Sequence, residues 1–325
     1  MPMAILPEMI ASPFPDDDVD PEIRDWLTQM AAASKALGSG PETPLGELRA
    51  NAEKQRKPWR SGGPAMHATE NLRVGASQTP IRIHRPNDSA VLPVLVYLHG
   101  GGWTLFSIDT HDRLMREYAA RAGVAVLGIE YPLSPEHRFP RALEAIDEVL
   151  GWLQREGAGL GLDAGRYALG GDSAGANLSV AAAIRQRDSQ MAMPRALLLN
   201  YGAFDGAMRA SFERYGDPDR YMLTGPEMDG FWVSYLGAAP VTDPLARPLH
   251  ADLRGLPPTW LCVAQCDVLL DENVEMAQRL EASGVDAELR IYEGATHSFL
   301  EAAAISSLTV RALDEASHWL AGRLA

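Results

Sequence analysis

Residues 171–175, Gly-Asp-Ser-Ala-Gly, match the pattern Gly-x-Ser-x-Gly and place Ser173 where a nucleophile could act. The apolar run 167–169 before them predicts a strand, and the small-residue segment 176–184 after them predicts a helix. A strand, a sharp turn and a helix can project a serine hydroxyl from a strained backbone, with room left by the flanking glycines. The first N–H groups of the helix would point toward developing negative charge. A glycine-rich turn with a surface serine is the alternative, and the order of elements favours a nucleophile.

A serine nucleophile needs a histidine as base, and the base needs an acid to orient it. In sheets of this kind the partners follow in the order serine, acid, histidine. Of the eight histidines, only His297 and His318 come late enough. His318 lies within the predicted closing helix, whereas His297 lies in a loop just past the last predicted strand. Loops after strand carboxyl ends carry the reactive groups of α/β sheets, so we favour His297.

The candidate acid is Asp267, which follows the predicted strand 259–264 and so also lies at a carboxyl end. Asp271 and Glu272 open the next helix and are explained as helix-start charges. Asp286 precedes a strand and would lie at the opposite edge of the sheet. The alternative for Asp267 is a carboxylate that caps a turn.

A run of glycines provides candidate donors for an oxyanion. Residues 99–103, His-Gly-Gly-Gly-Trp, follow the buried strand predicted at 94–98. Glycines without Cβ let backbone N–H groups approach a substrate carbonyl closely. A phosphate loop is the alternative, but the run lacks the Lys-Ser/Thr pair of a nucleotide P-loop and the spacing Gly-x-Gly-x-x-Gly.

The elements that must position these residues alternate between strand and helix, which predicts a mostly parallel sheet covered on both faces. Two helices are predicted before any strand, one from Pro21 to the glycines at 38–40 and one at 44–57. The segment 202–256 has no strand signal. These two segments do not fit the sheet pattern and would lie over one edge or end as a cap. Strands are predicted at 70–74, 81–84, 94–98, 124–129, 167–169, 196–200, 259–264 and 287–292, and further helices at 109–122, 140–156, 207–214, 226–236, 271–283 and 306–323.

Composition excludes several classes of protein. The chain has 325 residues, 46% of them hydrophobic, with a net charge of −14 and a pI of about 5.0, so a nucleic-acid partner is not expected. Cys262 and Cys266 are too few for a disulfide framework and are read as buried apolar residues. The acidic run 16–18 is read as a solvated helix entry, so no metal site is expected. No signal peptide is predicted at 1–15 and no apolar run could span a membrane, so we expect a cytoplasmic protein without stable membrane anchoring.

Together these motifs resemble the hormone-sensitive-lipase-like family of α/β-hydrolases, in its bacterial carboxylesterase branch. The aspartate before Ser173 is similar to the Gly-Asp-Ser-Ala-Gly subfamily. Val268 stands where the family usually has proline, Ser298 where it usually has glycine, and Ser134 replaces a common alanine. The resemblance rests on residues 99–102, 131–140 and 171–175, on Asp267 with Leu269 and 271–272, and on residues 297–299.

The resemblance implies an α/β-hydrolase fold, with a mostly parallel eight-stranded sheet flanked by helices and a helical cap. It implies four consecutive parts of the chain, and a homodimer through the last strand and helix, as is frequent in the family. The parts are an N-terminal cap segment at 1–57, a first catalytic part at 58–201, a cap insertion at 202–256 and a second catalytic part at 257–325.

The resemblance also assigns roles. It implies Ser173 as nucleophile, His297 as base and Asp267 as the acid that orients it, with no metal or organic cofactor. His99 would hold its loop in place. The implied oxyanion donors are the N–H groups of Gly101, Gly102 and Ala174. Trp103, Phe204, Met222, Phe231 and Trp232 are candidates for an apolar substrate pocket.

We therefore expect a serine carboxylic-ester hydrolase that acts on short- to medium-chain acyl esters through an acyl-enzyme. An amidase, an N-deacetylase or an acyltransferase with the same residues is one alternative. A non-catalytic small-molecule receptor on this fold is another, and the presence of Ser173, Asp267 and His297 argues against it.

Overall fold

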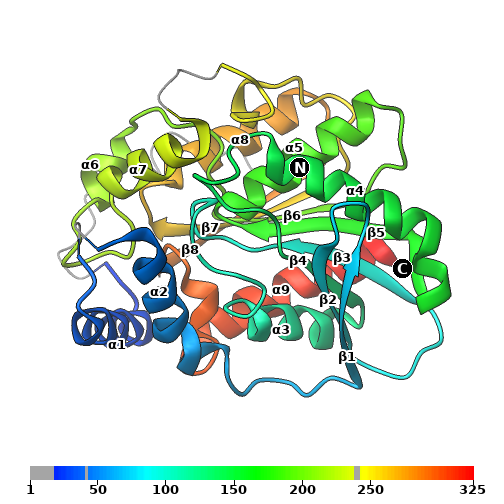
Figure 1. Ribbon diagram of the computed structural model, residues 1–325. Coiled ribbons are helices and arrows are strands. Elements are labelled where there is room, and N and C mark those ends of the chain that lie inside the picture. Colours follow the sequence, from blue (N-terminus) through cyan, green and yellow to red (C-terminus); the bar gives the residue numbers. More distant parts are fainter. Residues whose placement is uncertain (1–17, 41–42, 238–241) are drawn as a thin grey trace.

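A computed structural model describes residues 18–40, 43–237 and 242–325, and in these residues eight strands form one sheet (Figure 1). The strand order is β1-β2-β4-β3-β5-β6-β7-β8, with β1 and β2 antiparallel to their neighbours and the other pairs parallel. The predicted fold class is confirmed. The strands are β1 (Ala68–Val74), β2 (Thr79–Arg85), β3 (Leu92–Leu98), β4 (Ala125–Ile129), β5 (Leu162–Asp172), β6 (Leu197–Asn200), β7 (Thr259–Cys266) and β8 (Ala287–Thr296).

The central strands are continuous apolar runs because helices cover both of their faces. Every residue of β4, β6 and β7 is buried, whereas the edge strand β1 is mostly exposed. Figure 1 shows α3 and α9 on one face of the sheet and α4, α5 and α8 on the other. These helices are α3 (Asp112–Ala122), α4 (Arg141–Glu156), α5 (Ala174–Asp188), α8 (Leu270–Ala282) and α9 (Ser307–Leu324).

Three strands extend beyond their predicted ends, and the extensions decide where the reactive residues lie. β5 continues through the glycines to Asp172, which pairs with Asn200. After an irregularity in the register, β7 and β8 pair again at Cys266 and Thr296. His297 therefore follows its strand directly, where a loop was predicted from 294, because this pairing carries β8 onward.

The remaining helices gather at the side of the sheet where β7 and β8 end (Figure 1). We call them the cap helices: α1 (Pro21–Leu37), α2 (Leu45–Arg60), α6 (Ala210–Tyr215) and α7 (Gly225–Leu236). Asp20 caps α1 as its sequence predicts, with its side chain accepting from the N–H groups of Glu22 and Ile23 at 2.9 and 3.2 Å. Gly38 ends α1 in the left-handed conformation, at φ 71°.

Contacts such as the following join the N-terminal cap helices to each other and to the rest of the molecule. The Asp20 N–H donates to the Gly294 carbonyl of β8 at 3.0 Å. The Trp26 and Trp59 rings meet edge to face at 6.3 Å and join α1 to α2. Arg56 of α2 pairs with Glu301, just past β8, at 2.8 Å, and both side chains are buried. The start of α1 and the middle of α2 are thus tied to the segment that carries His297.

Several sequence predictions fall partly outside the described residues. The predicted cap parts 1–57 and 202–256 include residues 1–17, 41–42 and 238–241, and the division of the chain into four parts stays a prediction. Most of the acidic run 16–18 and the segment 1–15 also lie outside. Cys262 and Cys266 are both free and buried, as expected. Within the described ranges, no helix has the length and apolarity to cross a membrane.

Gly175 offers a direct test of this packing. A Cβ at this position would lie 1.9 Å from the Leu98 carbonyl oxygen, a backbone atom that cannot move without shifting β3. Gly175→Ala should therefore destabilise the protein by about 3 kcal/mol or more and lower its Tm by roughly 5 °C or more. Gly230→Ala is the control, because a Cβ there meets nothing within 4 Å. Thermal unfolding followed by circular dichroism measures both, and equal Tm values for the two variants would contradict the packing.

Candidate active site

Ser173 lies at the apex of the turn between β5 and α5, with backbone angles φ 54° and ψ −117°. A serine rarely adopts a positive φ, so the surrounding structure must hold it there. Its N–H donates to the Asn200 carbonyl at 2.9 Å, and its own carbonyl accepts from the N–H of Ala203 at 3.2 Å and of Ala176 at 3.1 Å. The next strand and the first turn of α5 thereby fix the direction of the Ser173 side chain.

His297 and Asp267 lie beside Ser173 because the residues before them, Thr296 and Cys266, are paired across β8 and β7. His297 Nε2 is 3.1 Å from Ser173 Oγ, and His297 Nδ1 is 2.7 Å from Asp267 Oδ2. The other oxygen of Asp267 accepts from the Leu269 N–H at 3.0 Å. The structure brings all three predicted residues into one chain of hydrogen bonds. Such a chain can move a proton from the serine to a histidine held in one tautomer by the carboxylate.

The glycine loop after β3 lies against this turn. Gly101 and Gly102 have φ of 106° and 58° and line the same cavity as Ser173 and His297. Within the described residues, the N–H groups of Gly101 and Gly102 donate no hydrogen bond. Ala174 is the first residue of α5, where helix geometry leaves the N–H without an intrahelical acceptor. All three predicted donors are therefore free to bind an oxyanion.

His99 opens the glycine loop and is fully enclosed. Its Nδ1 lies 2.8 Å from the Gly100 carbonyl oxygen, and its ring stacks on Tyr131 with centroids 4.3 Å apart. Burial, and then the nearby His111, lower the pKa of His99 to about 3. A neutral, packed imidazole fits the role of holding the loop.

Asp172 is the centre of a buried network that the sequence analysis did not find. Its carboxylate accepts from Tyr97 Oη at 2.8 Å and from the Gly100 N–H at 3.1 Å, and it lies 3.2 Å from His111 Nε2. Burial alone would raise the pKa of Asp172, but the charge and hydrogen bond of His111 outweigh it and lower that pKa. Burial would likewise lower the pKa of His111, and Asp172 raises it instead. Both shifts favour opposite charges on the two side chains, directly behind Ser173.

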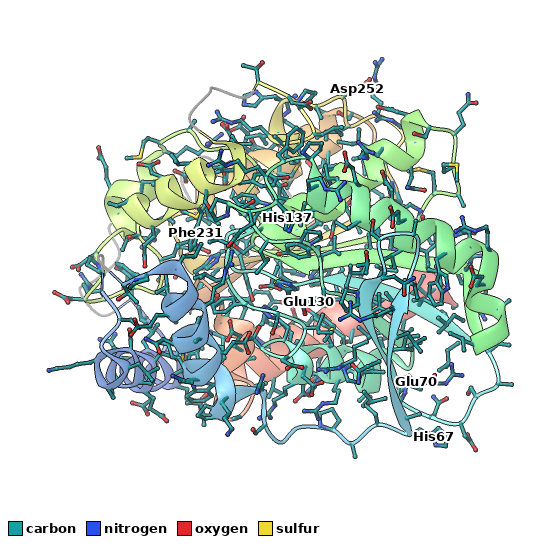
Figure 2. The ribbon with its side chains drawn as sticks, in the orientation of Figure 1. His67, Glu70, Glu130, His137, Phe231 and Asp252 are labelled. Carbon is teal, nitrogen blue, oxygen red and sulfur yellow. The ribbon has the colours of Figure 1, made fainter. Side chains whose placement is uncertain are left out.

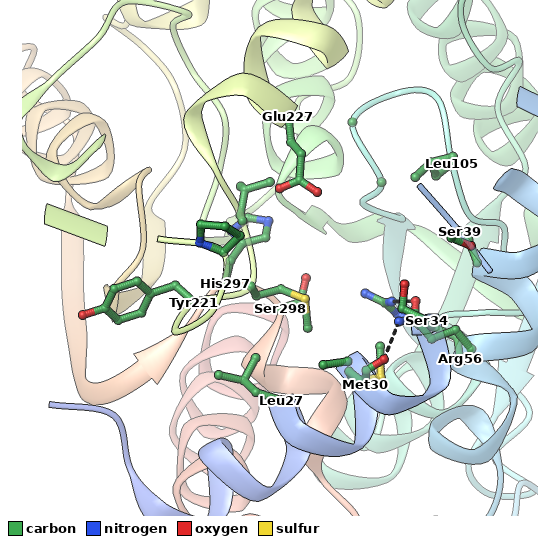
Figure 3. A pocket seen from close by; sticks show the side chains of 18 of the residues that line it. Leu27, Met30, Ser34, Ser39, Arg56, Leu105, Tyr221, Glu227, His297 and Ser298 are labelled. Atoms are coloured by element: carbon green, nitrogen blue, oxygen red, sulfur yellow. Dashed lines mark hydrogen bonds between the residues drawn. The ribbon is translucent and has the colours of Figure 1, made fainter. Parts of the chain in front are cut away.

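A cavity of about 830 Å³ opens above Ser173 and His297. Figure 3 shows Leu27 and Met30 of α1 on one side of it and Glu227 of α7 on the other. Phe231 of α7 lines the cavity and covers Gly102, whose added Cβ would lie 2.2 Å from its ring. The cap helices and the glycine loop together enclose the space.

The structure divides the five residues predicted for the substrate pocket into two groups. Met222 lines the cavity, as does Phe231. Trp103, Phe204 and Trp232 do not line it, because their rings are packed elsewhere. Trp103 stacks on Tyr235 at 4.3 Å and lies 4.6 Å from Trp232, while Phe204 fills the space beside Gly202. Lining residues that the sequence analysis missed include Leu27, Met30, Leu105, Phe106, Tyr221 and Met228.

No group of three His, Cys, Asp or Glu residues in the described part of the chain is arranged to hold a metal ion.

Comparisons with known proteins agree with this geometry. The family described as alpha/beta hydrolase fold matches residues 95–301. An ethyl acetate hydrolase of Pseudomonas putida is 35% identical over 70% of this chain and 73% of its own length. The carboxylic ester hydrolase LipN of Mycobacterium tuberculosis is 38% identical over 73% of this chain and 66% of its own.

Solved structures are similar over nearly the whole chain. A hyperthermophilic esterase from the archaeon Pyrobaculum calidifontis has a TM-score of 0.88 and 31% identity, covering 94% of this chain and 98% of that one. The carboxylesterase EstE1 from a metagenomic library has a TM-score of 0.84 and 31% identity, covering 88% and 100%. The chain belongs to the α/β-hydrolase fold family. Within that family it is a carboxylesterase of the hormone-sensitive-lipase-like group.

The buried pair of Asp172 and His111 makes stability depend on pH. Because the pKa of His111 is raised above 6.5, its stabilisation is complete below pH 6.5 and is lost as pH rises through the folded-state value. Asp172→Asn removes the partner charge and should cost about 3 kcal/mol near pH 6 and less near pH 9. Thermal unfolding of wild type and variant at both pH values measures the difference.

The matched control for this variant is Asp252→Asn. Asp252 lies at the periphery of the molecule (Figure 2) with about half of its side chain exposed, and among the described residues its carboxylate pairs with Arg254, so its loss should change the Tm little at either pH. A loss in Asp172→Asn that is equal at pH 6 and pH 9 would show that His111 does not carry the charge.

Proposed function

We propose that Ser173, His297 and Asp267 hydrolyse carboxylic esters of short- to medium-chain acids through an acyl-enzyme. The observation that carries this proposal is the hydrogen-bonded chain of 3.1 Å and 2.7 Å between these side chains at the floor of a cavity. Ser173 is in a strained turn that aims its hydroxyl, and the free N–H groups beside it offer a place for negative charge.

In the first half-reaction, His297 Nε2 takes the proton of the Ser173 hydroxyl while Oγ forms a bond to the ester carbonyl carbon. The carbonyl oxygen becomes an oxyanion and accepts hydrogen bonds from the N–H groups of Gly101, Gly102 and Ala174. When the tetrahedral intermediate collapses, the bond to the alcohol oxygen breaks and His297 returns its proton to that oxygen. Asp267 stabilises the imidazolium in between.

In the second half-reaction, a water molecule occupies the place of the departed alcohol. His297 removes one of its protons as the water oxygen attacks the acyl carbon, and the same donors hold the second oxyanion. Collapse breaks the bond to Ser173 Oγ, which regains its proton from His297, and the carboxylic acid leaves. The reaction consumes one ester and one water and needs no further group.

The cavity supports the preference for acyl chains of limited length. Its apolar lining includes Leu27, Met30, Phe106, Met222 and Phe231, which would contact the hydrocarbon part of a substrate. The cap helices close over this space and set its depth. The similarity to an ethyl acetate hydrolase favours the short end of the range.

Other reactions could use the same groups. An amidase, an N-deacetylase or an acyltransferase would form the same acyl-enzyme and differ in the leaving group or in the molecule that attacks. We retain ester hydrolysis because the relatives above are ester hydrolases. The expected cytoplasmic location and the homodimer stay predictions.

Ser173→Ala tests the nucleophile. With p-nitrophenyl esters from acetyl to palmitoyl, wild type should turn over short chains fastest, and the variant should lose at least roughly 10³-fold in kcat/KM. A serine-directed phosphonate should label wild type at Ser173 and leave the variant unlabelled. Wild type that is inert on every ester and resists the phosphonate would favour the receptor alternative.

Phe231→Ala tests the boundary of the cavity. Removing the ring that covers Gly102 should extend the acyl space and move the optimum of the p-nitrophenyl series toward longer chains. Val233→Ala is the control, since Val233 is on the same helix but is 61% exposed. An unchanged optimum in Phe231→Ala would mean that the acyl chain lies elsewhere in the cavity.

A further inference from the structure

Ser298, directly after His297, has a backbone conformation that a serine adopts at a cost. Its φ and ψ are 62° and 13°, in the left-handed region that favours glycine. Its carbonyl accepts from the Glu301 N–H at 3.0 Å and begins the short turn at 299–302. Glycine would adopt this backbone conformation at a lower cost in free energy than serine. The presence of serine at position 298 therefore suggests that its side chain has a role.

The Ser298 hydroxyl is open to the cavity and not sealed within the protein. The residue is only 6% exposed, and within the described residues its hydroxyl makes no hydrogen bond. Two other polar side chains of the cavity do have partners, since Tyr221 Oη donates to Asp18 and Ser39 Oγ accepts from Asn51. A substrate that fills the cavity removes solvent from this hydroxyl, and a hydroxyl left without a partner costs free energy, so an oxygen of the substrate is a candidate for its hydrogen bond.

Ser298 lies in the wall of the same cavity as Ser173 and His297 (Figure 3). Chemistry decides which part of an ester would lie against it. His297 Nε2 must return a proton to the leaving oxygen, so the alcohol part of the substrate has to be on the His297 side of Ser173. Because Ser298 follows His297 in the chain and lines the cavity, its side chain is the candidate contact for the alcohol part.

We propose that the Ser298 hydroxyl hydrogen-bonds an oxygen in the alcohol part of the substrate, so that this enzyme selects esters of polar alcohols over esters of hydrocarbon alcohols. The proposal rests on the ester hydrolysis proposed above and adds the class of alcohol. An ether or hydroxyl oxygen a few atoms beyond the ester oxygen would complete the hydrogen bonding of Ser298. An alkyl chain in the same place would leave the buried hydroxyl unpaired, which disfavours its binding.

The test compares two acetates with alcohol chains of equal length, 2-methoxyethyl acetate and n-butyl acetate. For each protein we take the ratio of the two kcat/KM values. The two esters differ in intrinsic reactivity by the same factor in every protein, so this factor cancels when the ratios of two proteins are compared. Ser298→Ala keeps the left-handed strain and removes only the hydroxyl. It should lower the ratio of methoxyethyl to butyl ester by about tenfold, mainly through a higher KM for the methoxyethyl ester.

Two further variants distinguish the effect of the Ser298 hydroxyl from the effect of backbone strain and from the general polarity of the cavity. Ser298→Gly removes both the hydroxyl and the strain, so it should lower the ratio equally while raising the Tm. Ser34→Ala removes a hydroxyl from the α1 wall of the same cavity, and its ratio should equal that of wild type.

The outcomes distinguish this inference from the function on which it rests. Wild type that hydrolyses both acetates, with a ratio unchanged in Ser298→Ala, overturns the role of Ser298 and leaves the ester hydrolase intact. A ratio that falls equally in Ser34→Ala also overturns it, because the effect would then belong to the whole cavity. Wild type inert toward both acetates overturns the two proposals together.

Discussion

The site depends on the close approach of two backbone segments, the end of β3 with the glycine loop and the turn that carries Ser173. Three glycines permit it. An added Cβ would lie 2.4 Å from the Leu98 carbonyl oxygen at Gly171, 1.9 Å from the same oxygen at Gly175, and 2.3 Å from Asp172 Oδ2 at Gly100. Because backbone atoms meet directly, the separation between Ser173 and the N–H groups of the glycine loop, the proposed nucleophile and oxyanion donors, is fixed by the sheet and not by mobile side chains. Such preorganisation is what stabilises a developing oxyanion.

This approach also buries a charge, and the fold has to neutralise it. The Asp172 carboxylate, next to Ser173, would oppose negative charge on the oxyanion if it were uncompensated. Tyr97 and the Gly100 N–H donate to it, and His111 supplies a positive charge at 3.2 Å. The positive end of α5 and the free N–H groups can then act on the oxyanion without competition. The Asp172 carboxylate thus accepts a hydrogen bond from the glycine loop, while His111 compensates its negative charge.

The sequence was a good guide to the sheet and to the residues at its carboxyl edge. Apolar runs identify buried strands, and parallel strands bring their ends together, so Ser173, Asp267 and His297 could be grouped before any geometry was known. The Asp172 network was missed because His111 lies in a turn whose position depends on tertiary packing. The ends of β5 and β8 were missed because cross-strand pairing, at Cys266 and Thr296 for example, carries a strand past its apolar run.

The aromatic residues show where sequence reasoning fails. Trp103 and Trp232 belong to segments that line the cavity, yet Trp103 stacks on Tyr235 and Trp232 packs against Trp103 at a tilt, whereas Phe231 lines the cavity. Residues 231 and 232 are neighbours in one helix, so a difference of about 100° around its axis separates lining from core. The hydrophobic periodicity of the sequence cannot give the rotation of α7 about its axis, because this rotation depends on how α7 packs against the loop after β3.

The division between sheet and cap has a consequence for how such an enzyme can change its substrate. The register of β7 against β8 places Asp267 and His297, and the turn after β5 places Ser173, whatever side chains the cap presents. Substitutions in the cap can then reshape the cavity without disturbing proton transfer. Ser298 differs from the cap residues, because it follows His297 in the chain and also lines the cavity. A substitution at Ser298 would therefore affect both the backbone next to His297 and the part of the cavity that we assign to the alcohol. A serine held in a strained conformation at such a position is consistent with a role for its hydroxyl.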